Sequence, residues 1–512
     1  MTGPLPLYII VWMPRVPPAI LLLALVLIGV VVALLIPVGQ PQNSPQAVPA
    51  AAVEVAAESP SAGAPPPGED LRKQISLLEG QVEYLQGQVS TLQEENNQLI
   101  QKLGSLGMKG APKMELPNPP EDPPDFVGMG LDMMKLRKLQ ALPIPTTGAS
   151  QAEVEAAILR WLRQQQPDDE APRFALALAA LGWIEKPVDP LPLRAALLAR
   201  QLGGWYDPEK ATLLTVDESV QPGMPPLDKP MAIAFGQLLR EFGSTLFPTG
   251  KGRLTTDQRL ARESLLAGDA GLTRFLFGLQ NPSAQSPLDL PSEDPDHPLN
   301  EVPMPLFLKE LSLFPFNRGF EFAQSLHSAG EYAQVNAAYS RPPLNSSEVV
   351  EVERYLDNNP QPAPRIQWAN TEVLGAKPFW DDSLGRFACF TALRTYNSDE
   401  DAGAGAKGWL ADRLLAYAAD SGPRDHAAWQ TLWIAPDSAA AFFKAMRHVL
   451  LQRYDVKPSR DEEGHLLLEA AGRQVRLMKN RDNNGVLLLD AASAEFASAL
   501  QSSLDGVPKP AP

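Results

Sequence analysis

The chain has 512 residues, an apolar fraction of 44% and a net charge of −16 at neutral pH. This length predicts roughly two to four domains, and the apolar fraction is enough to build a sizeable core. An acidic chain gains nothing from phosphate attraction, which argues against nucleic acid as a partner. The single cysteine, Cys389, excludes an intrachain disulfide, so a domain outside the cytoplasm must be stabilised by core burial.

The N-terminal region predicts a membrane anchor. Residues 19–38 are 20 residues without a charge, and at about 1.5 Å per residue they span a hydrocarbon core of about 30 Å. Arg15 precedes this run, and the next basic residue after it is Arg72. The asymmetry predicts a single-pass signal-anchor in the cell membrane, with residues 1–18 cytoplasmic and the large domain periplasmic or otherwise extracytoplasmic. A cleaved signal peptide is the alternative, but its apolar region is usually shorter.

A coiled-coil stalk is expected after the anchor. Residues 39–70 are rich in Pro and Ala, as in an extended linker, and residues 71–106 then carry an unbroken heptad pattern. Mostly β-branched a positions with Leu at d favour a parallel homodimer, and an Asn at one a position disfavours other oligomers. An amphipathic helix packed on the main domain is the alternative, against which the narrow stripe argues. The expected seam is Leu71, Ile75, Leu78, Val82, Leu85, Val89, Leu92, Asn96, Leu99, Leu103 and Leu106.

A second Pro-rich linker, residues 107–125, leads into the globular region. Apolar periodicity predicts a mainly helical part over residues 126–360, with a turn and short strand at 205–216. Its helices are expected at 152–166, 174–183, 231–247, 256–280 and 316–339. An α+β part over residues 361–505 is expected to hold an antiparallel sheet, and residues 506–512 form a tail. Its strands are expected at 409–418, 429–435, 465–470, 474–479 and 486–489, with helices at 437–453 and after 490.

Several spaced motifs resemble, in order, those of a family of bacterial zinc metallopeptidases. That family has a GxYDP turn, an HExxH helix, an EGDA helix, a long PYxxGxxF…AYxxPPxS motif, an LGE motif and an AxGWxGDR motif. All of these motifs except HExxH have a counterpart here. In the same order, the counterparts are Gly204–Pro208, Leu265–Ala270, Phe314–Tyr355, Leu384–Gly385 and Ala406–Arg413. The resemblance covers roughly residues 126–446 and implies a mainly helical, metallopeptidase-like domain.

The residues that would carry the family's chemistry are absent from this chain. In the family, two His of HExxH and a Glu of the next helix bind zinc, and the Glu of HExxH is the general base. Phe235 and Leu239 stand in place of the two His, Gly236 in place of the base, and Ala267 in place of the third ligand. The five His of the chain include no pair at i,i+4 spacing. We therefore expect no metal and no cofactor, and a former metal site plugged by apolar side chains.

Four carboxylates remain near the lost site: Glu241, Asp257, Glu263 and Asp269. They could form a rebuilt acid/base pair, but each has a structural interpretation. We expect Asp257 to cap a helix N-terminus and Glu263 to lie on a solvated face beside Arg259 and Arg262. Asp269 is expected to support the fold. The Trp residues are expected in the core rather than on a sugar-binding platform.

The sequence therefore predicts a membrane-anchored, non-catalytic relative of a zinc metallopeptidase, in other words a pseudoenzyme. Its expected role is binding or scaffolding in the cell envelope, with a peptide or an envelope protein as partner. Two alternatives stay open: an enzyme with a rebuilt, metal-free carboxylate site, and a purely architectural envelope protein.

Overall fold

The computed structural model describes residues 125–504, except residues 217–228, 249–252, 282–297, 358–363, 369, 421–423 and 481–483. All described residues belong to one compact unit, Pro117–Pro512. The expected transmembrane segment at 19–38, both linkers apart from Asp125, the heptad seam at 71–106 and the tail at 506–512 lie outside the described residues. Among the helices that are described, none combines the length and apolar character needed to cross a membrane.

The first helices and a small sheet form one side of the helical part. They are α3 (Phe126–Leu136), α4 (Gln151–Gln164), α5 (Glu170–Ala180) and α6 (Pro190–Leu202), with strands β1 (Thr146–Ala149), β2 (Gly204–Asp207) and β3 (Thr212–Val216). Strand β3 pairs in parallel with β1 and antiparallel with β2. A capping box of Ser150 and Glu153 starts α4, and Gly203 in the left-handed conformation ends α6.

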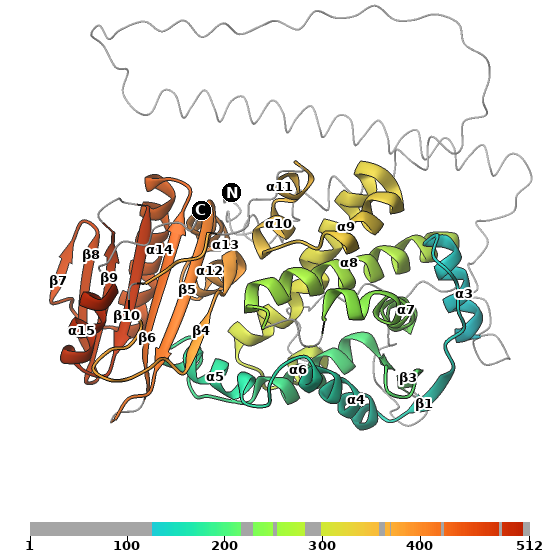
Figure 1. The fold of residues 1–512 in the computed structure, drawn as a ribbon, viewed down its shortest axis with the longest axis horizontal. Helices are drawn as coiled ribbons and strands as arrows, with labels where there is room; N and C mark the ends of the chain where they lie inside the picture. The colour runs from blue at the N-terminus through green and yellow to red at the C-terminus, as the bar shows by residue number, and fades with distance from the viewer. Residues whose placement is uncertain are drawn as a thin grey trace, which may run out of the picture. The chain divides into compact units, whose positions relative to one another are not determined.

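Three long helices form the centre of the helical part, and Figure 1 shows them side by side. They are α7 (Lys229–Leu246), α8 (Thr256–Gln280) and α9 (Leu306–Ser340); a short 3-10 turn, η3 (Pro298–Asn300), precedes α9. Helices α8 and α9 pack closely because both carry glycine at the contact: a Cβ on Gly268 would lie 1.9 Å from the carbonyl oxygen of Gly319. Helix α9 kinks at Gly330 and Glu331, which leave helical geometry. Two short helices follow, α10 (Ser346–Val350) and α11 (Val352–Leu356).

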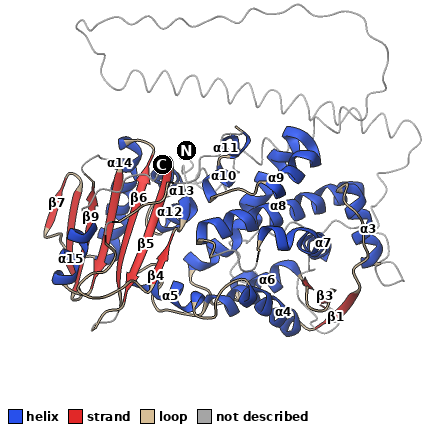
Figure 2. Cartoon of the chain, viewed as in Figure 1, coloured by secondary structure: helices blue, strands red, loops and turns tan. Residues whose placement is uncertain are grey.

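The C-terminal part is a seven-stranded sheet with the order β4-β5-β6-β10-β9-β8-β7, in which every neighbouring pair is antiparallel. Figure 2 shows these strands in red beside the helices that cover them. The strands are β4 (Trp380–Asp382), β5 (Trp409–Tyr417), β6 (His426–Trp433), β7 (Arg460–Glu462), β8 (His465–Ala470), β9 (Arg473–Lys479) and β10 (Gly485–Ala491). The helices are α12 (Gly385–Arg394), α13 (Asp399–Ala406), α14 (Pro436–Tyr454) and α15 (Ala494–Leu504).

Both faces of this sheet are buried. Successive residues of a strand point to opposite faces. On β10, Leu488 joins a main core that includes Phe442 of α14, whereas Leu489 joins a smaller core that includes Phe496 of α15. The main core runs from Met133 to Leu488, so the helical part and the sheet part share one apolar interior.

Candidate functional site

The four residues that the resemblance aligns with a zinc site lie in this interior. Phe235, Gly236 and Leu239 are on α7, and Ala267 is on α8, which packs against α7. The exposed fraction is 7% for Phe235, 4% for Leu239 and 2% for Ala267, and Gly236 is also buried. These side chains are therefore core residues in the folded protein.

Aromatic rings fill the space beside α7. The ring of Phe235 lies 5.4 Å from Trp205 on β2 and 6.1 Å from Phe316 on α9. Gly236 faces the β2–β3 hairpin, because a Cβ built there would lie 3.0 Å from the Cβ of Tyr206. A side chain at position 236 would therefore meet the hairpin rather than a cavity. Throughout the described ranges, no group of three His, Cys, Asp or Glu residues could hold a metal ion.

Asp269, two residues after Ala267 on α8, is the centre of a buried polar network. Arg137 donates to both of its carboxylate oxygens, at 2.7 and 2.8 Å, and the Tyr339 hydroxyl donates at 2.8 Å. The side chains of Arg137 and Asp269 are fully buried, and the guanidinium lies 4.4 Å from the Tyr332 ring centroid. Burial and the neighbouring Asp269 carboxylate raise the pKa of the Tyr339 hydroxyl well above its usual value. Asp269 thus ties α3, α8 and α9 together.

A second buried cluster joins the helical part to the sheet. Asp412 on β5 accepts from the backbone N–H groups of Leu384 and Gly385, each at 2.9 Å, and from the Trp429 indole at 2.9 Å. Asp257 on α8 accepts from the backbone N–H of Ser346 at 2.9 Å. Two of the motif segments, Leu384–Gly385 and Ala406–Arg413, thus meet at the carboxylate of Asp412.

The expected role of Asp257 as a helix cap is corrected by the structure. The N-cap of α8 is Thr255, whose side chain accepts from the Gln258 backbone N–H, and Asp257 is only 2% exposed. Burial is the main cause that raises the pKa of Asp257 to about 7, and burial likewise raises the pKa of Asp382 to about 6. Asp382 accepts from the backbone N–H of Thr256 at 3.0 Å, which fixes the start of α8 to β4.

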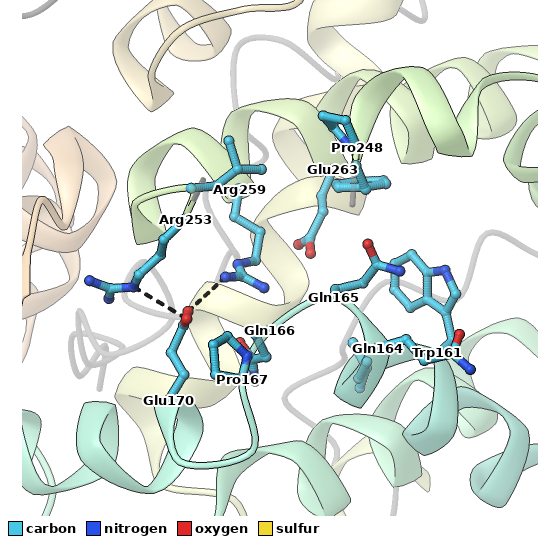
Figure 3. A pocket seen from close by; sticks show the side chains of 13 residues that line it. Trp161, Gln164, Gln165, Gln166, Pro167, Glu170, Pro248, Arg253, Arg259 and Glu263 are labelled. Atoms are coloured by element: carbon cyan, nitrogen blue, oxygen red, sulfur yellow. Dashed lines mark hydrogen bonds and ion pairs between the residues drawn. The ribbon is translucent and has the colours of Figure 1, made fainter. Parts of the chain in front are cut away.

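A cleft of about 430 Å³ lies between the α4–α5 turn, the end of α7 and the first turns of α8 (Figure 3). Its apolar floor is formed by Trp161, Leu162, Phe247 and Leu254. A smaller cavity of about 80 Å³ shares four lining residues with it: Gln166, Glu170, Arg259 and Glu263. Clefts in this size range are typical small-molecule sites, so this is the candidate functional site.

The carboxylates of the cleft are already paired with arginines. Glu170 accepts from Arg259 at 2.8 Å and lies 3.3 Å from the Arg253 Nε, as Figure 3 shows. Glu263 pairs with Arg194 on α6 at 2.5 Å. The expectation of a solvated face for Glu263 is therefore wrong, because Glu263 is only 8% exposed and its ion-pair partner comes from another helix.

The other predicted residues lie outside this cleft. Arg262 donates to the carbonyl oxygen of Leu246 at 2.7 Å. Glu241 is exposed on α7. The residues of the α4–α5 turn that line the cleft carry no motif, so sequence reasoning missed them.

The match to a known protein family covers only the sheet part. A domain of unknown function (DUF8575) matches residues 375–501, which run from just before β4 into α15. This match does not include α7, α8 or the cleft. No curated protein and no solved structure matches the chain.

Proposed function

We propose that this chain is a membrane-anchored, non-catalytic protein, related to zinc metallopeptidases, that binds or scaffolds other molecules of the cell envelope. The observation that carries this proposal is the position of Gly236. A general base there would be pressed against the β2–β3 hairpin, because a Cβ on Gly236 would lie 3.0 Å from the Cβ of Tyr206 and 3.2 Å from the side chain of Leu213. The buried Phe235 and Leu239 on the same helix offer no metal ligand.

Binding is better supported than a rebuilt carboxylate enzyme. General acid–base catalysis needs a carboxylate that can exchange a proton with the substrate. In the cleft, Glu170 and Glu263 are held by arginines, whereas Asp257, which has the raised pKa, is fully buried and does not line the cleft. The cleft therefore offers fixed polar groups for recognition rather than a poised acid/base pair.

The membrane anchor and the parallel homodimer stay part of the proposal on the strength of the sequence alone. The apolar run at residues 19–38 would fix the protein to the membrane, and the heptads at 71–106 would pair two copies. Two clefts would then be displayed together outside the cell membrane.

The experiment is a peptidase assay on the full-length protein in detergent, with fluorescently labelled casein and added zinc. We expect no turnover above the buffer rate, in the wild type and in Glu263→Gln alike. Turnover that is lost in Glu263→Gln would support the rebuilt carboxylate site instead. Turnover that a zinc chelator abolishes would overturn the non-catalytic assignment altogether.

A further inference from the structure

The cleft of Figure 3 contains polar atoms that are open to its interior and have no protein partner. Only one carboxylate oxygen of Glu263 is bound, by Arg194. In the part of the chain that the structure describes, the other oxygen has no partner, and the amides of Gln165 and Gln166 have none either. None of these atoms is shut off from solvent. Figure 3 shows Gln165, Glu263 and Arg259 reaching toward the same opening.

The charges around the cleft balance, which favours a neutral ligand. Each guanidinium lies within ion-pair distance of a carboxylate, and the numbers of the two groups are equal. A ligand with a net charge would lose its hydration on binding and would find no unpaired opposite charge in the cleft to replace it. The arginines that line the cleft are Arg253 and Arg259, and the carboxylates that line it are Glu170 and Glu263.

The free atoms of the cleft include both donors and acceptors. The free oxygen of Glu263 only accepts, the remaining N–H groups of Arg259 only donate, and the amide of Gln165 does both. A hydroxyl group both donates and accepts, so neighbouring hydroxyls can bridge a carboxylate and a guanidinium. A trans secondary amide on the ligand points its N–H and its C=O in opposite directions, so it can donate to one Gln amide and accept from another.

The walls of the cleft favour a compact ligand over an extended peptide. An extended peptide is commonly bound by addition to the edge of a sheet. The walls of this cleft come from the α4–α5 turn, the end of α7 and the start of α8, and no residue of a described strand lines it. Its apolar floor includes Trp161, of which 8% is exposed, enough for contact with a methyl group or a ring edge.

We propose that the cleft binds a neutral saccharide that carries an acetamido group. Its hydroxyls would bond to Glu263 and Arg259, its acetamide to Gln165 and Gln166, and its methyl group would contact the floor beside Trp161. This inference rests on the proposed binding function and names the ligand class of that site.

The test is calorimetric titration of the full-length protein, in a detergent without a sugar headgroup, with chitotriose, maltotriose and tri-alanine. Chitotriose should bind, and maltotriose, which has hydroxyls but no acetamide, should bind at least about tenfold more weakly because the Gln amides stay unpaired. The double variant Gln165→Ala/Gln166→Ala should weaken chitotriose by about tenfold or more. The matched control is Gln151→Ala on α4, whose amide bonds to Glu155 away from the cleft and whose loss should leave binding unchanged.

Two results would overturn the saccharide assignment. One is no chitotriose binding by the folded protein, or binding that the double variant leaves unchanged. The other is binding of tri-alanine, lost in the double variant, without binding of chitotriose; the cleft would then be a peptide site and the proposed binding function would stand. Peptidase turnover would remove the proposed function whatever the titrations show, so the two failures are distinguishable.

Discussion

At the scale of single residues, the described part is held by charged groups that are completely removed from water. Arg137 and Asp269 are both fully buried, and their side chains meet in a bidentate ion pair. Such a pair contributes little over an apolar replacement, but the loss of one partner leaves an uncompensated charge in the interior.

We therefore expect Asp269→Asn to lower the free energy of unfolding by about 3–5 kcal/mol. Chemical denaturation of the full-length protein, followed by tryptophan fluorescence, measures this. The matched control is Asp132→Asn, which removes an ion pair with Lys135 whose side chains are 70% and 61% exposed. Exposed pairs contribute about 0–1 kcal/mol, so equal effects of the two changes would contradict the role given to Asp269.

The buried Asp257 predicts that stability falls as pH rises. Its pKa is about 7 in the folded protein and about 4 in an unfolded chain, so the folded state binds the proton more tightly. Its contribution is fully present below about pH 4 and is lost as pH rises through about 7. We expect the free energy of unfolding to drop by an amount of the order of a few kcal/mol between about pH 5 and about pH 8.

The control for this pH dependence is Asp257→Asn, which keeps an acceptor for the Ser346 N–H but cannot titrate. It should flatten the profile relative to the wild type. The comparison is needed because burial lowers the pKa of His426, which acts in the opposite direction as pH falls. A profile that is identical in wild type and variant would show that Asp257 does not titrate as proposed.

Residue environments of this kind could be predicted only in part. Asp257 sits at a helix start and looks like a cap, but its partner Ser346 is 89 residues away. Glu263 has Arg259 four residues before it on the same helix, yet it pairs with Arg194, which is 69 residues away. The local sequence shows only the partners that are close along the chain. The tertiary fold determines which residue forms the hydrogen bond or ion pair.

At the scale of elements, the contact between α8 and α9 depends on glycine. A Cβ on Gly268 would lie 1.9 Å from the backbone oxygen of Gly319, far inside contact distance. We expect Gly268→Ala to force the helices apart and to lower the free energy of unfolding by about 1–3 kcal/mol, as overpacking does.

The matched control is the same substitution on another helix. Gly403 lies in α13 and a Cβ there meets nothing within 4 Å. Gly403→Ala should raise the free energy of unfolding, by up to about 1 kcal/mol, because alanine is the better helix former. Denaturation midpoints of the two variants check both signs, and a neutral Gly268→Ala would contradict the close helix contact.

The elements with strong periodicity were those that the sequence could predict. The expected helices at 231–247 and 256–280 correspond to α7 and α8, and the expected strand at 465–470 corresponds to β8. Strands β4 and β7 have only three residues each, too few to show alternation. Helix α6 was missed although its Asp189 cap and Pro190 are helix-start signals.

At the scale of the whole molecule, the account predicts a dimer formed by the heptads at residues 71–106. The full-length protein in detergent should sediment as a dimer. The double variant Leu85→Asp/Leu92→Asp places charges in the seam and should sediment as a monomer. Gly87→Ala, at a solvent-facing heptad position, is the control and should remain dimeric. A wild-type protein that sediments as a monomer would contradict the stalk.

We propose that apolar core side chains occupy the position at which the resembling metallopeptidases bind zinc. The most direct measurement is the zinc content of the full-length protein, by inductively coupled plasma mass spectrometry, after incubation with zinc and removal of free metal. With Phe235, Gly236, Leu239 and Ala267 in the interior, the account predicts well below one zinc per chain. One tightly held zinc per chain would contradict it.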